Sequence, residues 1–210
     1  MSGAPPLRII GIDPGTRFVG YGVVDLVGAE LRHVASGCIR AESPDVPERL
    51  AAIHTALVTQ IRAHVPAGTL VEAAVETAFA GVNPRTAIAI GEGRGVAIAA
   101  AATAGIPVRG YEPALVKRAV AGSGRAGKEQ VRAIVQTLLR LPSPPATDHE
   151  SDALAIAVAH ALRRRAPERR EMSPSARAAL GGVRKGLAPG VAAQLPGGRA
   201  GRRKRSRFGV

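Results

Sequence analysis

Hydrophobic residues follow two periods along the chain, one typical of strands and one typical of helices. Residues 7–12 form a nearly continuous apolar run, which predicts a central strand covered on both faces. Residues 19–24 and 30–39 predict two more strands, the second entered through a short turn at Gly28. Short turns join antiparallel neighbours, so we expect these three strands to form a meander.

Helical and strand patterns alternate in the next part of the chain. Apolar residues recur at helical spacing from Pro47 to Ile61, and residues 86–104 form a second helical pattern rich in Gly and Ala. The remaining predicted elements are strands at 70–77 and 106–111, helices at 113–120 and 128–141, and a last helix that begins at Thr147. This order predicts an α/β fold in which helices flank a mixed five-stranded sheet, the layout of ribonuclease H-like proteins.

Small residues dominate the predicted core. Only 2% of the residues are aromatic, so Ala, Val, Ile and Leu must fill the interior. In the Gly/Ala-rich helix, Gly91, Gly93 and Gly95 each cost about 1 kcal/mol of helix propensity relative to Ala. We therefore expect another part of the molecule to approach this helix closely.

Positive charge is concentrated toward the C-terminus. The chain has 29 Lys and Arg against 16 Asp and Glu, and 14 of the basic residues but only 2 of the acidic ones lie between residues 163 and 210. From residue 166 onward the hydrophobic period is lost, so we expect a folded domain over residues 1–165 and a disordered basic tail over residues 166–210. Such a tail indicates a polyanionic partner, nucleic acid before membrane, although a solubilising extension has the same composition.

No stretch of the sequence predicts export or a membrane span. No apolar run reaches the length that crosses a bilayer, and the N-terminal residues lack the basic start and cleavage site of a signal peptide. We expect a cytoplasmic protein with no membrane partner.

Carboxylates end two of the predicted strands. Asp13 follows the first strand at a Pro-Gly turn, which it could simply cap, and Glu76 closes the fourth strand. In a ribonuclease H-like sheet these strand ends are neighbours, and the last helix adds Asp152 with either His149 or Asp148 on the same face. Carboxylates with at most one imidazole suit Mg²⁺ or Mn²⁺, and two such ions about 4 Å apart would support phosphodiester hydrolysis.

Five spaced motifs resemble the RuvC family of Holliday junction resolvases: GIDPGTRFVGYGVV, SGCIR, VETAF, GRGVAIAAA and SDALAIAVAHA. The resemblance implies a divalent-metal-dependent endodeoxyribonuclease that cuts four-way junction DNA by paired symmetric nicks in recombination and repair. It implies Asp13, Glu76, His149 and Asp152 as the catalytic, metal-binding residues, with His149 favoured over Asp148 by register.

The same resemblance implies DNA-binding residues and partners. Lys117 and Lys128, in a local basic patch, fall at the family's phosphate-contacting positions, and Phe79 matches its base-stacking aromatic residue. The Gly/Ala-rich helix would meet its copy in a homodimer, and the branch-migration proteins RuvA and RuvB would be partners. The alternatives are a related metal-dependent nuclease and a non-catalytic junction-binding protein of the same fold.

Overall fold

The computed structural model describes residues 5–77 and 83–165, which all belong to one unit of the chain. Their elements follow the order β1 (Leu7–Asp13), β2 (Phe18–Val27), β3 (Glu30–Arg40), α1 (Val46–His64), β4 (Val71–Glu76), α2 (Pro84–Thr103), β5 (Val108–Tyr111), α3 (Pro113–Ala121), α4 (Lys128–Leu139) and α5 (Asp148–Arg165). Each matches a predicted segment, with bounds that differ by a few residues. None of the helices in these ranges is long and apolar enough to cross a membrane.

The sheet has the strand order β3-β2-β1-β4-β5. The first three strands form the predicted antiparallel meander, with Gly28 at a φ of 59° in the turn between β2 and β3. β4 pairs with β1 in parallel and β5 pairs with β4 in parallel, so the sheet is mixed, as predicted. The register places Ile12 opposite Val75, which brings the following residues, Asp13 and Glu76, to the same end of the two strands.

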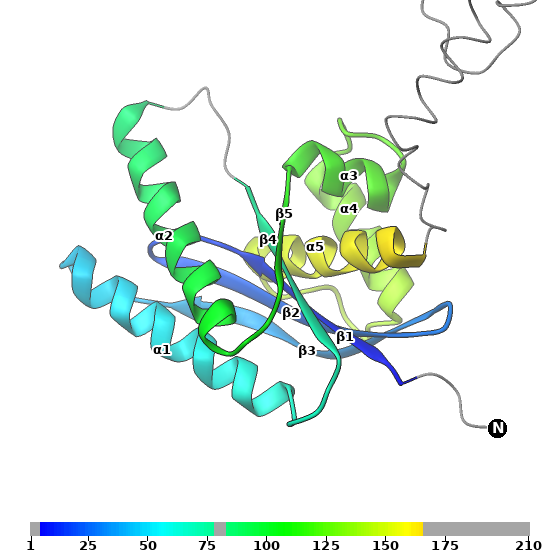
Figure 1. The fold of residues 1–210 in the computed structure, drawn as a ribbon. Helices are drawn as coiled ribbons and strands as arrows, with labels where there is room; N and C mark the ends of the chain where they lie inside the picture. The colour runs from blue at the N-terminus through cyan, green and yellow to red at the C-terminus, as the bar shows by residue number, and fades with distance from the viewer. Residues whose placement is uncertain (1–4, 78–82, 166–210) are drawn as a thin grey trace, which may run out of the picture. The chain divides into compact units, whose positions relative to one another are not determined.

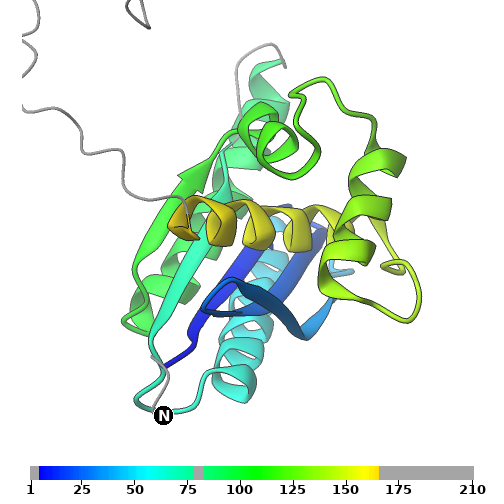
Figure 2. The same cartoon turned by 90° about the vertical axis from the view of Figure 1, so that its right-hand side faces the viewer.

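Helices cover both faces of the sheet (Figures 1 and 2). α1 and α2 pack on one face, where their apolar side chains meet Ile10, Ile12 and Val75. α5 lies on the other face with α3 and α4, against Ile9 and Val24. Successive residues of β1 therefore point into two different cores, which is why its apolar run is continuous.

Side-chain caps fix where helices begin. Asp45 accepts a hydrogen bond from the amide of Glu48 at the start of α1. Thr147 accepts one from the amide of Glu150, at 3.1 Å, and so caps α5. The Glu150 carboxylate also accepts a 2.6 Å hydrogen bond from the hydroxyl of Ser36, which ties the first turn of α5 to β3.

Glycines on β1 and β2 let α5 lie directly on the sheet. A Cβ atom at Gly11 would overlap the carbonyl oxygen of Ala153, and one at Gly20 would overlap that of His149. Any side chain at these two positions would push the helix away. The close approach puts the first turns of α5, which carry His149 and Asp152, beside the end of β1.

The close approach predicted for the Gly/Ala-rich helix, α2, occurs at one of its three glycines. A Cβ atom at Gly93 would lie 2.7 Å from the carbonyl oxygen of Gly15, in the turn after β1. Apart from the backbone of α2 itself, no described atom lies within 4 Å of a Cβ placed at Gly91 or Gly95. Packing among the described residues therefore explains Gly93 alone.

Candidate active site

The side chains predicted to bind metal lie together at one end of the sheet. Asp13 ends β1, Glu76 ends its parallel neighbour β4, and His149 and Asp152 come from the first turns of α5. Nδ1 of His149 lies 2.7 Å from Oδ2 of Asp13, and Asp13 is close enough to Glu76 to raise the pKa of that carboxyl. Residues far apart in the sequence thus form one polar cluster.

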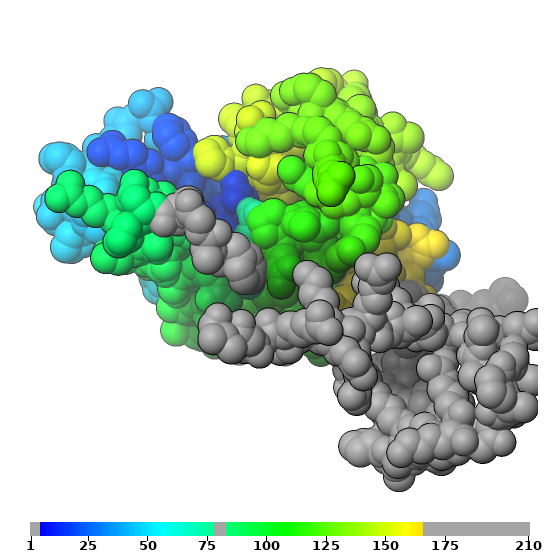
Figure 3. Space-filling model, turned by 90° about the horizontal axis from the view of Figure 1, so that it is seen from above, coloured from blue at the N-terminus to red at the C-terminus, as the bar shows by residue number. Residues whose placement is uncertain are grey.

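A concavity of about 270 Å³ adjoins this cluster. Its polar lining consists of Glu76 and Asp152 together with Lys117 from α3 and Lys128 from α4. The two lysines predicted to contact phosphates therefore line the same space as two of the acids. Seen from above, atoms of the first strands (blue) are exposed between those of α2 (green) and those of α4 (yellow-green) (Figure 3).

Burial and mutual repulsion change the protonation of the acids. Burial, together with the charges of Asp13 and Asp152, raises the pKa of Glu76 to about 8. The pKa of Asp152 is also raised, first by burial and then by the charge of Asp13. At neutral pH and without metal, Glu76 therefore keeps its proton. A cation among these oxygens would displace that proton and relieve the repulsion.

The donor set fits a hard divalent cation, because it combines three carboxylates with one imidazole. Burial and the neighbouring carboxylates raise the pKa of Glu76, so a cation among these oxygens would favour its ionised form. Across residues 5–77 and 83–165, however, no three His, Cys, Asp or Glu side chains already surround a common point as metal ligands. Some of these side chains must therefore change rotamer when a cation binds.

The structure distinguishes between His149 and Asp148 as the candidate fourth ligand, which the helical spacing could not do. Asp148 is 57% exposed and pairs with Lys128 at 3.2 Å, whereas His149 points at Asp13. The contact favours donation from Nδ1 of His149 to the Asp13 carboxylate, a tautomer that leaves Nε2 of the imidazole facing away from Asp13 and available to a cation. This geometry favours His149 as the fourth ligand, with Asp148 orienting Lys128.

One predicted site residue, Phe79, lies outside the described residues. A different aromatic residue stands at the site, where the ring of Phe18 stacks on that of His149 with centroids 5.7 Å apart and planes at 12°. Phe18 was not expected there. The one sequence signal that could have drawn attention to it is the scarcity of aromatic residues, since the chain has only 3 Phe.

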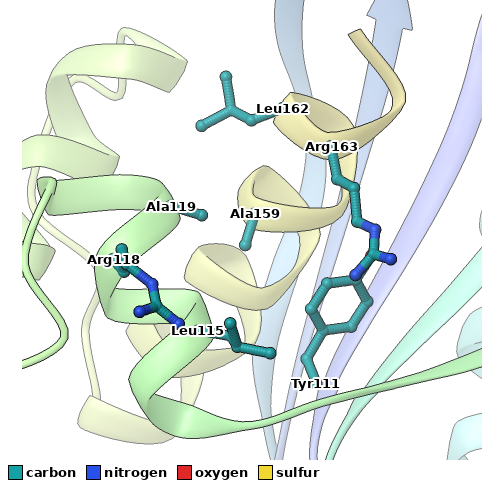
Figure 4. A pocket seen from close by; sticks show the side chains of 7 residues that line it. All are labelled: Tyr111, Leu115, Arg118, Ala119, Ala159, Leu162 and Arg163. Atoms are coloured by element: carbon teal, nitrogen blue, oxygen red, sulfur yellow. The ribbon is translucent and has the colours of Figure 1, made fainter. Parts of the chain in front are cut away.

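A second concavity, of about 320 Å³, lies between α3 and the C-terminal half of α5 (Figure 4). It is lined by Tyr111, Leu115, Arg118, Ala119, Ala159, Leu162 and Arg163. This lining is mostly apolar and includes no carboxylate, so the concavity is separate from the acidic cluster. Figure 4 shows the Arg163 side chain beside the ring of Tyr111, whose hydroxyl lies 2.8 Å from Nδ1 of His160.

Known proteins match most of the described chain. The family model for crossover junction endodeoxyribonuclease RuvC matches residues 9–160. The chain belongs to the RuvC family. RuvC of Pelotomaculum thermopropionicum is 49% identical over 157 residues, which are 74% of this chain and 93% of that protein. RuvC of Alkalilimnicola ehrlichii is 47% identical over 153 residues, 73% of this chain and 90% of that protein.

Solved structures agree with the RuvC assignment. Thermus thermophilus RuvC in complex with Holliday junction substrate matches with a TM-score of 0.68 and 36% identity, over 75% of this chain and 94% of that one. The yeast mitochondrial Holliday junction resolvase Ydc2, at 10% identity and a TM-score of 0.52 over 78% of this chain and 83% of that one, shares the fold alone. The predicted family and ribonuclease H-like fold class are confirmed, and the protein is accordingly an endonuclease that acts on DNA.

Proposed function

We propose that this endonuclease resolves Holliday junctions by paired symmetric nicks in homologous recombination and DNA repair. The observation that carries this function is the convergence of three carboxylates and His149 at one end of the sheet, beside Lys117 and Lys128. The similar RuvC of Thermus thermophilus has been solved with Holliday junction substrate, which supports the same substrate here.

We propose that Asp13, Glu76, His149 and Asp152 hold two Mg²⁺ or Mn²⁺ ions, which supply the Lewis acidity for phosphodiester hydrolysis. His149 would bind through Nε2, because its Nδ1 faces Asp13. Glu76 must lose its proton to become a ligand, so cation affinity should increase as the pH rises toward its pKa of about 8. Since imidazole is a softer ligand than carboxylate, Mn²⁺ should support nicking at least as well as Mg²⁺.

Basic and aromatic side chains beside the acids would position the DNA. Lys117 and Lys128 line the same concavity as Glu76 and Asp152, so a phosphate that enters it meets two ammonium groups. We propose that Phe79 stacks on an unpaired base at the crossover. Phosphate contacts fix the register of the DNA, while stacking favours a junction over a continuous duplex.

We propose a homodimer, because two copies of the site can then address both strands of a two-fold symmetric junction. An exposed stripe on α2 supports this: Ile88 is 63% exposed, and Gly91, Gly95 and Ala99 follow it at helical spacing. With no described atom near a Cβ at Gly91 or Gly95, a second helix could approach these backbone positions closely. We also propose a cytoplasmic location, with RuvA and RuvB as partners at the junction.

We propose that residues 1–165 are the nuclease domain and that the basic residues 166–210 add affinity for DNA. Removing the residues after Arg165 should weaken junction binding and reduce its salt dependence without abolishing nicking. A truncated protein that folds but no longer nicks would contradict this division.

A cleavage assay on two matched substrates tests the function. The protein and its Asp152→Asn variant are incubated in Mn²⁺ with a labelled four-way junction and with a linear duplex of matching sequence. We expect paired symmetric nicks on the junction alone, lost in the variant while binding persists. Binding without nicking in any metal would make the chain a junction-binding protein, and equal nicking of the duplex would make it a general nuclease.

A further inference from the structure

We propose that Phe18 is a positioning residue for His149, which it orients by ring stacking, and that Arg40 supports Phe18 in this position. This role presupposes the proposed function of His149 as a cation ligand. Phe18 itself would touch neither the cation nor the scissile phosphate. Its effect would be to hold the imidazole plane in the orientation that a cation requires.

The two rings form an offset, nearly parallel stack. Their centroids are 5.7 Å apart and their planes differ by 12°. Offset stacks with centroids about 4.5 to 7 Å apart are a preferred arrangement of aromatic rings. Phe18 begins β2 and His149 lies in the first turn of α5, so the stack joins the sheet to the helix that carries two proposed ligands.

His149 depends on this stack because little else restrains its ring. Its side chain is 44% exposed, and its hydrogen bond among the described residues runs from Nδ1 to Asp13 at 2.7 Å. That bond fixes one atom of the ring, whereas the stack fixes the plane. Together they set the direction of the Nε2 lone pair before a cation arrives, which reduces the conformational freedom lost on binding.

Arg40 restrains Phe18 from the neighbouring strand. The two residues are partners in the register of β2 and β3, and the guanidinium carbon of Arg40 lies 5.7 Å from the centroid of the Phe18 ring. Arg40 also forms an exposed ion pair with Glu42 at 2.9 Å. Since Phe18 is 40% exposed, burial alone does not hold its ring. A series of contacts thus runs from β3 through Phe18 and His149 to Asp13.

Two substitutions of Phe18 separate stacking from apolar contact. Phe18→Leu keeps a branched apolar side chain but removes the flat ring, and Phe18→Tyr keeps the ring. In the DNA-free protein, Phe18→Leu should weaken Mn²⁺ binding, measured by calorimetry, by about twofold to tenfold. In the metal-free protein, the same variant should shift the imidazole proton resonances of His149 downfield, because the ring current of Phe18 is lost. Phe18→Tyr should restore both values.

A double-mutant cycle decides whether Phe18 acts through His149. In a His149→Ala background, Phe18→Leu should change neither Mn²⁺ binding nor junction nicking any further. Arg40→Ala should weaken Mn²⁺ binding in the same direction as Phe18→Leu but less. Arg32→Ala, at an exposed arginine of β3 that pairs with Glu30 instead, is its matched control and should change nothing.

The outcomes distinguish failure of this inference from failure of the proposed function. If His149→Ala leaves Mn²⁺ affinity unchanged, His149 is not a ligand and its proposed function fails. If His149→Ala weakens binding but Phe18→Leu does not, or if Phe18→Leu impairs nicking equally in both backgrounds, Phe18 does not position His149. The second result would instead assign Phe18 a direct contact with DNA.

Discussion

Two histidines of α5 each pair with a carboxylate of the sheet, in opposite surroundings. His149, in the first turn, lies 2.7 Å from Asp13, and its side chain is 44% exposed. His160, farther along the same helix, lies 2.6 Å from Glu72 and is fully buried, at 0% exposure. The two carboxylates are similarly buried, with Asp13 14% and Glu72 15% exposed, so the pairs differ in the exposure of the imidazole.

At the buried pair, every ring nitrogen and carboxylate oxygen has a partner. Nε2 of His160 donates to Glu72, Nδ1 accepts from the Tyr111 hydroxyl at 2.8 Å, and Arg164 lies 3.3 Å from the other oxygen of Glu72. Burial lowers the pKa of His160, so its ring stays neutral. A satisfied network of this kind joins α5 to β4 and β5 and leaves no atom free for chemistry.

At the exposed pair, the polar groups are incompletely satisfied. Only Nδ1 of His149 is engaged by Asp13, and burial together with the charge of Asp13 raises the pKa of the neighbouring Glu76. Incomplete satisfaction near solvent is a physical sign of a ligand site, whereas complete satisfaction away from solvent indicates a structural role. Four predictions test whether this distinction holds.

Replacing each carboxylate by its amide should produce the largest difference in nicking rate between the two pairs. Asp13→Asn removes the charge of a proposed cation ligand and should slow junction nicking by about a thousandfold or more, with junction binding retained. Glu72→Gln should leave the nicking rate nearly unchanged, because an amide oxygen can still accept from His160. Single-turnover nicking of a four-way junction measures both. Equal losses in the two variants would show that the pairs do not differ in role.

Removing the exposed imidazole should have the next largest effect. His149→Ala should reduce the nicking rate by about a hundredfold with little change in the free energy of unfolding, because the side chain is partly exposed. His54→Ala, on α1, is a control and should nick normally. Full activity of His149→Ala together with loss in Asp148→Ala would transfer the fourth ligand position to Asp148.

Removing the buried imidazole should instead reduce stability. His160→Ala leaves the Tyr111 hydroxyl and the Glu72 carboxylate without their partner and should lower the free energy of unfolding by about 2 kcal/mol or more. The folded fraction should still nick junctions. Urea unfolding measures the loss, and His160→Gln should lose less because it can keep one hydrogen bond. A stable but inactive His160→Ala protein would give this pair a catalytic role.

The pH dependence of stability should have opposite signs at the two sites. The lowered pKa of His160 gives stability that is present above pH 6.5 and is lost as the pH falls. The raised pKa of Glu76, about 8, gives stability that is present below pH 4.5 and is lost as the pH rises toward 8. Between pH 6.5 and 8 only the second effect remains, so the metal-free protein should lose stability there.

Urea unfolding in chelator across that pH range checks this smallest effect. Glu76→Gln should abolish the loss, and saturating Mn²⁺ should reverse it, because a cation binds the deprotonated carboxylate. A metal-free protein whose stability increases from pH 6.5 to 8 would show that Glu76 is not the titrating group.

The secondary structure and the acidic residues could be predicted from the sequence because both leave local signals. The apolar run of β1 reports burial on two faces, and helical spacing reports one buried face. Asp13 and Glu76 are visible as carboxylates where such strands end, and the parallel register of β1 and β4 then makes them neighbours. The predicted and observed bounds of the elements differ by a few residues. One example is α4, which ends at Leu139 rather than 141 because Arg140 adopts a left-handed conformation.

The partners of individual side chains were decided only by the tertiary structure. His149 and Asp148 share the first turn of α5, and only the approach of that helix over Gly11 and Gly20 turns His149 toward Asp13. Neither the stack of Phe18 on His149 nor the pairing of His160 with Glu72 has a local signal, because the partners come from distant segments. The hydrophobic period indicates which face of a helix or strand is buried, whereas side-chain pairing depends on how separate elements pack against one another.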